Sequence, residues 1–270
     1  MDRKKPSIKF GCHDFLNSRP LLTPLIKGEI SYGFQLILDS PARIAEQLRA
    51  GEIQLGVIPA IEYARRPGYL LVPEVAIASR GAVKTVAIFS RKPLSEIRSL
   101  AVDQRSCTSV AMLQILFRER YGREPALLPR RPALEEMLTQ ADGALIIGDL
   151  TEGGAEIEVY DLGAEWYRLT GRPFVHAFLA VDPRWELQEE VEILKESQRR
   201  GLAQLPAIAA EEARARGLSE DVCLDYLQHR IHYRLGPEEI EGLEHFYQLA
   251  QRHGVIPEEA PLHFFHGGRR

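Results

Sequence analysis

Cysteine is scarce in this chain of 270 residues, and long apolar runs are missing. Its three cysteines, Cys12, Cys107 and Cys223, lie far apart and form no Cys-x-x-Cys pair. An odd, scattered set argues against a disulfide framework and against a cysteine-rich zinc site. The longest unbroken apolar run extends from Ala177 to Val181, far short of the ~18 residues that a membrane-spanning helix needs.

An excess of positive charge is also absent. The chain has 34 Lys and Arg against 38 Asp and Glu, a net charge of −4 with histidine neutral. A mildly acidic chain lacks the basic field of a nucleic-acid-binding protein, so we expect neither a nucleic-acid nor a membrane partner. No apolar segment follows the basic residues of MDRKKPSIKFGCHDF, which argues against a secretory signal and favours a cytoplasmic location. A local cationic pocket for a small anion remains compatible with this charge.

Several motifs for cofactors and catalysis are missing. There is no G-x-G-x-x-G or Walker loop, so no nucleotide cofactor is indicated. There is no G-x-S-x-G nucleophile elbow either. His229 and His232 could share one helix face, as metal ligands do, but no carboxylate or cysteine accompanies them at a matching spacing. We therefore expect neither a cofactor nor a metal.

What is present is the pattern of an α/β protein. With 45% hydrophobic and 27% charged residues, the composition is that of an ordinary globular protein. Short apolar strands alternate with amphipathic helices. We predict strands over 7–11, 33–39, 55–58, 83–90, 100–103, 126–128, 143–147 and 174–181. We predict helices over 20–26, 41–49, 106–121, 132–140 and 166–170, and an almost wholly helical region over 186–253.

Two long strands, 83–90 and 174–181, suggest a division into two lobes. One long strand can belong to two sheets, so we expect the chain to cross between the lobes there. Lobe 1 would hold residues 1–88 and 178–270, and an inserted lobe 2 would hold residues 89–177. A ligand would then bind in the cleft between the lobes, where pockets commonly form.

A polar motif, FLNSRPL at 15–21, stands where the first strand gives way to a helix. Free backbone N–H groups at a helix start favour an anion. Asn17 and Ser18 can each donate and accept a hydrogen bond, and Arg19 can grip a carboxylate through two parallel bonds. The alternative is that Asn17 or Ser18 merely caps the helix.

Two further segments carry candidate site residues. In DQRSCTSV at 103–110, the hydroxyls of Ser106, Thr108 and Ser109 exceed what one helix cap requires, which favours an oxyanion pocket. An elaborate cap is the alternative. SRGAVKTVAIFSR at 79–91 begins with Ser79 and places Ser90 at the expected crossing, facing the cleft if the lobe model holds. Its alternative is surface arginines at each end and a glycine turn.

Five segments together resemble the chorismate dehydratase family of the futalosine route to menaquinone. They are LNSRPL (16–21), GVIPAIEYA (56–64), SRGAVKTVAIFSR (79–91), VDQRSCTSVAMLQILF (102–117) and EWYRLTGRPFVHAF (165–178). The chain departs at His176-Ala177-Phe178, where family members often read Phe-Ala-x-Trp, and at Gly148-Asp149-Leu150-Thr151, where they read Gly-Asp-x-Ala.

The resemblance implies a type II periplasmic-binding-protein fold with the ligand cleft between two lobes. It implies loss of water from chorismate to give 3-[(1-carboxyvinyl)oxy]benzoate. Chorismate carries a ring carboxylate and an enolpyruvyl carboxylate, so its site needs two groups of anion-binding residues. Asn17 would assist the elimination by hydrogen-bonding the reacting centre, and Ser90 would orient a carboxylate or the leaving hydroxyl. The substrate-binding residues would be Ser18, Arg19, Ser79, Ser106, Thr108 and Ser109. The substrate's own enolpyruvyl carboxylate is a hypothetical base.

Two alternatives to a chorismate dehydratase stay open. One is a 1,4-dihydroxy-6-naphthoate synthase of the same superfamily, which usually opens with a Pro-rich, Asp-Thr-containing motif that is absent here. The other is a solute-binding module that holds a small anion without turnover. Incubation with chorismate separates them, because an enzyme consumes the diene and a receptor returns chorismate intact.

Overall fold

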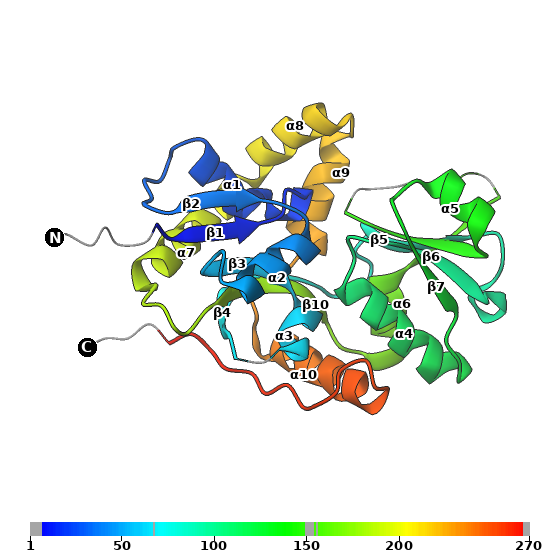
Figure 1. Cartoon of the computed structure of the whole chain (residues 1–270). Coiled ribbons are helices and arrows are strands. Elements are labelled where there is room, and N and C mark those ends of the chain that lie inside the picture. The colour runs from blue at the N-terminus through cyan, green and yellow to red at the C-terminus, as the bar shows by residue number, and fades with distance from the viewer. Residues whose placement is uncertain (1–6, 67, 149–153, 155, 267–270) are drawn as a thin grey trace.

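The computed structural model describes residues 7–66, 68–148, 154 and 156–266. Within these residues two five-stranded sheets form the framework (Figure 1). The first sheet has the order β2 (Gln35–Leu38), β1 (Lys9–Cys12), β3 (Leu55–Pro59), β10 (Phe174–Val181), β4 (Leu70–Ser79). The second has the order β7 (Ala126–Arg130), β6 (Ser99–Asp103), β8 (Gly143–Ile147), β5 (Val86–Ser90), β9 (Glu158–Asp161). One strand in each sheet runs antiparallel to both of its neighbours. This strand is β10 in the first sheet and β5 in the second.

Helices cover both sheets. The first sheet is accompanied by α1 (Arg19–Ile26), α2 (Pro41–Ala50), α3 (Ala60–Arg65), α7 (Gln188–Ala203), α8 (Leu205–Arg216), α9 (Glu220–Asp225) and α10 (Pro237–Arg252). The second is accompanied by α4 (Thr108–Tyr121), α5 (Leu134–Gln140) and α6 (Leu162–Thr170). We call the first sheet with its helices lobe 1, and the second lobe 2. No helix in the described part of the chain is long and apolar enough to cross a membrane.

The local sequence explains where α2 begins and ends. The Ser40 hydroxyl accepts a hydrogen bond from the Arg43 amide at 3.4 Å, and Pro41 occupies the first turn. At the other end Gly51 adopts a left-handed conformation with φ of 74°. This is the arrangement that the Ser-Pro pair predicts, since proline is tolerated where the helix N–H has no partner.

The crossings between the lobes lie outside the two long strands. The chain passes from the first sheet to the second over residues 80–85 and returns over 171–173. The expectation that each long strand serves both sheets is therefore wrong, because β5 belongs wholly to the second sheet and β10 wholly to the first. The predicted boundaries at 88/89 and 177/178 fall inside these strands. The reason is a backbone turn: Gly81 (φ 86°) and Lys84 (φ 64°) are left-handed, which ends extended structure before Val86.

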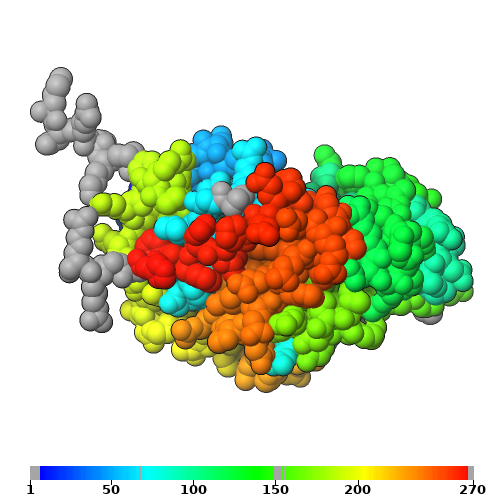
Figure 2. Space-filling view, turned by 90° about the horizontal axis from the view of Figure 1, so that it is seen from below, coloured from blue at the N-terminus to red at the C-terminus, as the bar shows by residue number. Residues whose placement is uncertain are grey.

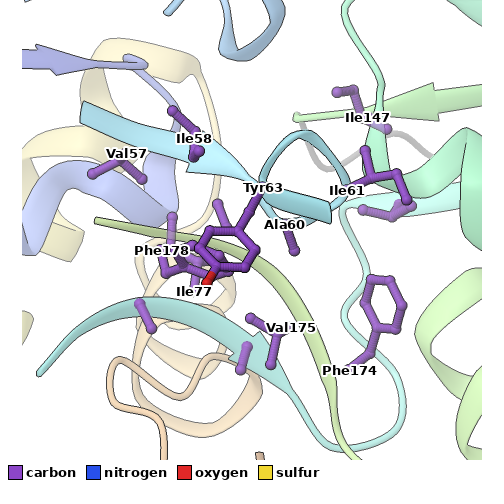
Figure 3. Close-up of a cluster of buried hydrophobic side chains, with 14 of the residues drawn as sticks. Val57, Ile58, Ala60, Ile61, Tyr63, Ile77, Ile147, Phe174, Val175 and Phe178 are labelled. Atoms are coloured by element: carbon purple, nitrogen blue, oxygen red, sulfur yellow. The ribbon is translucent and has the colours of Figure 1, made fainter. Parts of the chain in front are cut away.

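A continuous apolar core joins the two lobes. Figure 3 shows part of it, with Ile61 of α3 in lobe 1 near Ile147 of β8 in lobe 2, beside the β3 and β10 side chains. Tyr63 and Phe178 pack edge to face there, with ring centroids 5.5 Å apart. A second, smaller cluster, which includes Phe89 and Met137, lies on the other side of the second sheet. The lobes are thus packed against each other around a shared interior.

The C-terminal region reinforces this contact. Figure 2, a view from below, shows α10 and the following segment 255–266 lying across lobe 1, with α10 reaching lobe 2. The segment adds to the sheet through hydrogen bonds between Leu71 and both His263 and Phe265, each 2.8 Å long. At the end of α10, the His253 carbonyl accepts a hydrogen bond from Arg118, and its Nε2 lies 2.6 Å from Glu119 Oε1. Both partners belong to α4, so α10 ties the lobes together.

Candidate functional site

A pocket of about 560 Å³, counting its open mouth, lies between the lobes. Lobe 1 contributes His13, Phe15, Asn17, Pro41, Pro59, Ile77, His176 and Ala177. The crossing segment and lobe 2 contribute Val83, Thr85, Val86, Arg105, Ser106, Cys107, Thr108, Ser109, Ile147 and Gly148. The pocket therefore needs both lobes, as the sequence predicts.

Asn17 stands in this pocket and is held by Tyr226. Its Nδ2 donates a hydrogen bond of 3.0 Å to the Tyr226 hydroxyl, which also lies 3.0 Å from Thr85 Oγ1. Tyr226 is fully buried, and burial raises its pKa to about 12, so it stays a neutral phenol. Asn17 Oδ1 is buried and makes no hydrogen bond within the described residues. Its capacity to accept a hydrogen bond is therefore unused among the described residues.

Two histidines, the buried His13 and the half-buried His176, line the same pocket, and each is hydrogen-bonded to a serine. His13 Nδ1 lies 2.9 Å from Ser18 Oγ, and His176 Nε2 lies 2.9 Å from Ser79 Oγ. Burial lowers the pKa of both imidazoles to about 4, so both are neutral at pH 7. Ser18 and Ser79, predicted to touch substrate, do not line the pocket and instead orient histidines that do.

The turn before α4 forms the lobe 2 wall. Arg105 clamps the buried Asp103 carboxylate, with Nε–Oδ1 at 3.0 Å and Nη2–Oδ2 at 2.7 Å. Its guanidinium also donates to the Ile147 carbonyl at 3.1 Å and stands over the Phe15 ring at 5.6 Å. The arginine thus fixes this wall and brings its charge to the edge of the pocket, where Asp103 balances it.

The first turn of α4 presents hydroxyls and amides to the pocket. Ser106, Thr108 and Ser109 all line it. Thr108 Oγ1 accepts a 3.3 Å hydrogen bond from the Ile61 amide across the lobes, while Ser106 Oγ is buried with no hydrogen-bond partner among the described residues. The first amides of a helix lie outside its own hydrogen-bond ladder and carry partial positive charge. This end of the pocket can therefore bind a carboxylate. Burial also raises the pKa of the Cys107 thiol to about 11, which keeps it protonated.

Ser90 does not reach the pocket, and the expectation that it faces the cleft is wrong. Val86, at the start of β5, lines the pocket, whereas Ser90 ends the strand opposite Gly143. Its hydroxyl donates to the Asp142 carbonyl and accepts from the Lys92 amide, both at 2.9 Å. The physical reason is the early crossing at 80–85, which puts the opposite end of β5 at the cleft.

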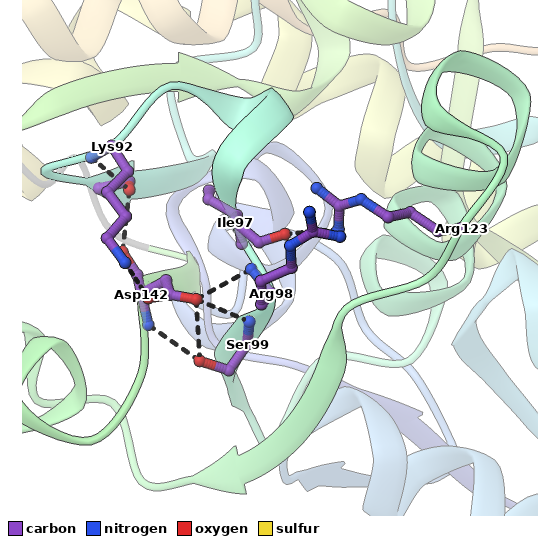
Figure 4. A network of polar contacts seen from close by, with 7 residues as sticks. Lys92, Ile97, Arg98, Ser99, Arg123 and Asp142 are labelled. Atoms are coloured by element: carbon purple, nitrogen blue, oxygen red, sulfur yellow. Dashed lines mark hydrogen bonds and ion pairs between the residues drawn. The ribbon is translucent and has the colours of Figure 1, made fainter.

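Asp142 organises the region around Ser90 (Figure 4). Its carboxylate meets Lys92 Nζ at 2.6 Å and accepts from the amides of Arg98 at 2.9 Å and Ser99 at 3.0 Å. These bonds, led by that to Lys92, lower the pKa of Asp142 to about 2. The network is a structural fastening of β5, β6 and β8, distant from the pocket along the strands.

Arg19 is likewise outside the pocket lining. Its Nη2 lies 2.6 Å from Asp14 Oδ1 and its Nε lies 3.1 Å from Glu212 Oε1. The start of α1 directs this side chain toward α8, where two carboxylates already neutralise it. The predicted grip of Arg19 on a substrate carboxylate is not the arrangement found.

Sequence reasoning overlooked Thr85, His13 and Tyr226 at the site, and it noted His176 only as a departure from the family. Thr85 lies inside the quoted 79–91 segment, where alternation from Ser90 drew attention to the other strand face. His13 follows the predicted strand 7–11 and stood as an isolated polar residue, whereas His176 lies within the predicted strand 174–181. Tyr226 carried no local signal, because it reaches Asn17 from 209 positions further along the chain. No group of three or more His, Cys, Asp or Glu in the described residues is placed to hold a metal.

Comparison with known proteins gives a consistent picture. A family model described as menaquinone biosynthesis matches residues 8–252. The chorismate dehydratase of Thermus thermophilus is 30% identical over 241 residues, which cover 79% of this chain and 86% of the relative.

Solved structures share the architecture at low sequence identity. A protein from Archaeoglobus fulgidus superposes with a TM-score of 0.74 at 14% identity, covering 94% of this chain and 100% of the other. The alkanesulfonate-binding protein from Xanthomonas axonopodis pv. citri, bound to MOPS, gives 0.64 at 14% identity, covering 94% and 96%. The periplasmic aliphatic sulphonate binding protein from Escherichia coli gives 0.61 at 15% identity, covering 99% and 96%. The chain therefore has the periplasmic-binding-protein fold that the sequence predicts.

Proposed function

The chain belongs to the menaquinone biosynthesis family, and we propose that it dehydrates chorismate to 3-[(1-carboxyvinyl)oxy]benzoate. The observation that carries this proposal is that Asn17 and Thr85 both line a pocket between two lobes and both hydrogen-bond to the Tyr226 hydroxyl. The Asn17 amide and the Thr85 hydroxyl, both hydrogen-bonded to one buried phenol, are polar groups able to orient the leaving hydroxyl of a ring-shaped substrate. The relative that acts on chorismate is 30% identical over most of the chain.

The pocket suits a dicarboxylic ring compound. The start of α4, with the hydroxyls of Ser106 and Ser109, is a seat for one carboxylate. The neutral imidazole of His176 supplies a second polar contact, because its Nδ1 makes no hydrogen bond within the described residues. Apolar side chains such as Ile77 and Val86 line the space between. This combination of an apolar cavity with a few fixed polar groups orients a ring-shaped ligand.

The elimination removes a proton from C3 and the hydroxyl from C4 of chorismate. The electron pair of the C3–H bond becomes the new ring double bond, hydroxide leaves from C4, and the two fragments make water. The ring becomes aromatic, so the driving force lies in the substrate. The protein lowers the barrier by holding one reactive conformer and by hydrogen-bonding the leaving hydroxyl, for which a positioned acid or base contributes ~10²–10⁴-fold.

The base is the substrate's own enolpyruvyl carboxylate in this proposal. Among the described residues that line the pocket there is no Asp or Glu. His13 and His176, with pKa values of about 4, are weak bases at pH 7. Asn17 Oδ1 and the Thr85 hydroxyl are left to orient the hydroxyl and the carboxylate of the substrate. Ser90 takes no part in the reaction.

We also propose a cytoplasmic location for this reaction. Cys12, Cys107 and Cys223 are unpaired thiols. Unpaired cysteines are typical of proteins in a reducing compartment.

Incubation of the purified protein with chorismate tests the proposal. We expect the diene absorbance to disappear and an aromatic product to form, identified by chromatography and mass spectrometry. Asn17→Ala should lose most of the turnover, about 100-fold or more, while its circular dichroism stays that of the wild type. A binding isotherm with chorismate recovered intact would make the protein a receptor, and unchanged turnover in Asn17→Ala would remove that residue from the mechanism.

A further inference from the structure

We propose that Tyr226 is a positioning residue that fixes the direction of hydrogen bonding at Asn17 and Thr85. The inference rests on the proposed function, because it concerns how these two groups meet the substrate. Tyr226 does not line the pocket. It acts from behind the wall, through one hydroxyl that touches both groups at 3.0 Å.

A phenol hydroxyl has one proton to donate, and its oxygen accepts. The Asn17 amide donates its Nδ2–H to this oxygen. The Tyr226 proton is then free for the other neighbour, Thr85 Oγ1. Since Thr85 accepts that proton, its own hydroxyl hydrogen is left to point into the pocket. The relay therefore runs from Asn17 through Tyr226 to Thr85.

This direction assigns opposite roles to the two pocket groups. Asn17 Oδ1, which is buried and has no hydrogen-bond partner among the described residues, is the acceptor that the substrate meets in this proposal. Thr85 turns a hydrogen to the substrate as a donor, and its hydroxyl is polarised because it already accepts a hydrogen bond. A donor suits the departing C4 oxygen, on which negative charge develops during the elimination. An acceptor beside it suits the hydrogen of that same hydroxyl or an adjacent polar group.

The surroundings of Tyr226 hold the relay in place. The residue is fully buried, and it begins a π-helical turn, Tyr226–Arg230, that directly follows α9. Single π-helical turns are frequent at functional sites. The preceding residue, Asp225, binds Lys84 Nζ at 3.2 Å and Arg230 Nε at 3.0 Å.

The crossing segment is fixed from its other side as well. The Asp161 carboxylate accepts from the amides of Val83 at 3.1 Å and Lys84 at 2.5 Å. Thr85 is therefore fastened by its neighbours on lobe 2 and by Tyr226 on lobe 1. The phenol sets the distance between two catalytic groups that belong to different parts of the chain.

Tyr226→Phe tests the proposal, because it removes the hydroxyl and keeps the ring. We expect kcat for chorismate to fall about 10- to 100-fold, the scale of losing one positioned hydrogen bond, while KM changes less than about 3-fold. Tyr233→Phe is the matched control. Tyr233 is also buried, and its hydroxyl has no hydrogen-bond partner in the described residues. Its kcat should stay within about 2-fold of the wild type.

A double-mutant cycle separates positioning from general stability. Turnover is divided by the folded fraction, measured by circular dichroism and by binding of the benzoate product. In a Thr85→Val background the added Tyr226→Phe change should cost less than it does in the wild type, because one of its two targets is gone. Equal costs in both backgrounds, an unchanged kcat in Tyr226→Phe, or a rise in KM alone would overturn the inference. If the wild type itself leaves chorismate intact, the proposed function fails instead.

Discussion

His13→Gln should make the protein less sensitive to mild acid. His13 is 4% exposed, and burial lowers its pKa from 6.5 to about 4. Between pH 6.5 and pH 4, His13 is therefore mostly protonated in the unfolded chain and mostly neutral in the folded chain. Stability is lost as the pH falls through this window, because the unfolded state holds more protons there. Glutamine keeps a polar group near Ser18 and does not titrate.

The magnitude follows from the two pKa values. At pH 5 an unfolded histidine with a pKa of 6.5 is mostly protonated, while the buried one is mostly neutral. One pKa unit corresponds to about 1.4 kcal/mol, so this single group costs about 2 kcal/mol between pH 7 and pH 5. His176 acts in the same direction and remains in both proteins, so the comparison isolates His13.

Urea unfolding at pH 7 and pH 5 measures this effect. The wild type should lose about 2 kcal/mol more than His13→Gln between the two pH values. The difference is insensitive to any constant change in stability that the substitution brings. The exposed His229 provides the control, His229→Gln, which should follow the wild type. Equal losses in the wild type and in His13→Gln would refute the reasoning.

Two further substitutions test the architecture around the site. Ser90→Ala should leave kcat and KM for chorismate within about 2-fold and lower the free energy of unfolding by about 1–2 kcal/mol, because Ser90 bonds Asp142 and Lys92 rather than a ligand; a 10-fold loss of kcat in steady-state assays would restore Ser90 to the mechanism. Gly201→Ala should destabilise by about 3 kcal/mol or more, since a Cβ there would stand 1.7 Å from the Pro20 carbonyl oxygen between α7 and α1. Its control is Gly33→Ala, where nothing lies within 4 Å, and similar thermal unfolding of both variants would contradict the contact.

The sequence predicts most strands where the apolar pattern is unbroken. β8 (Gly143–Ile147) and β10 (Phe174–Val181) have the predicted bounds. β4 (Leu70–Ser79) was not predicted, because Pro73 and Glu74 interrupt its apolar run. It tolerates them as the edge strand of its sheet, with a register shift against β10 between Phe178 and Leu179. β9 (Glu158–Asp161) is a short, polar edge strand without an apolar pattern.

The sequence predicted pocket residues where a strand is followed by a helix, and it missed or misplaced the others. The structure places Asn17, Ser106, Thr108 and Ser109 at the pocket, and their roles toward substrate stay predictions. Ser90 was misplaced because the crossing depends on the left-handed backbone of Lys84, a conformation rare for a non-glycine residue. Pairings such as Tyr226 with Asn17 join distant parts of the chain, and no local pattern encodes them.

The bridge made by α10 limits how this pocket can admit a ligand. A rigid-body rotation of lobe 2 would have to break the contacts of Arg118 and Glu119 with His253. It would also expose the apolar core between the lobes, to which Ile61 and Ile147 belong. Water would then have to cover surface that is now dry, at a cost of roughly 25 cal/mol for each Å² uncovered. Entry by small rotations at the pocket rim avoids that cost. The two lobes are thus already packed together around the pocket before the substrate arrives.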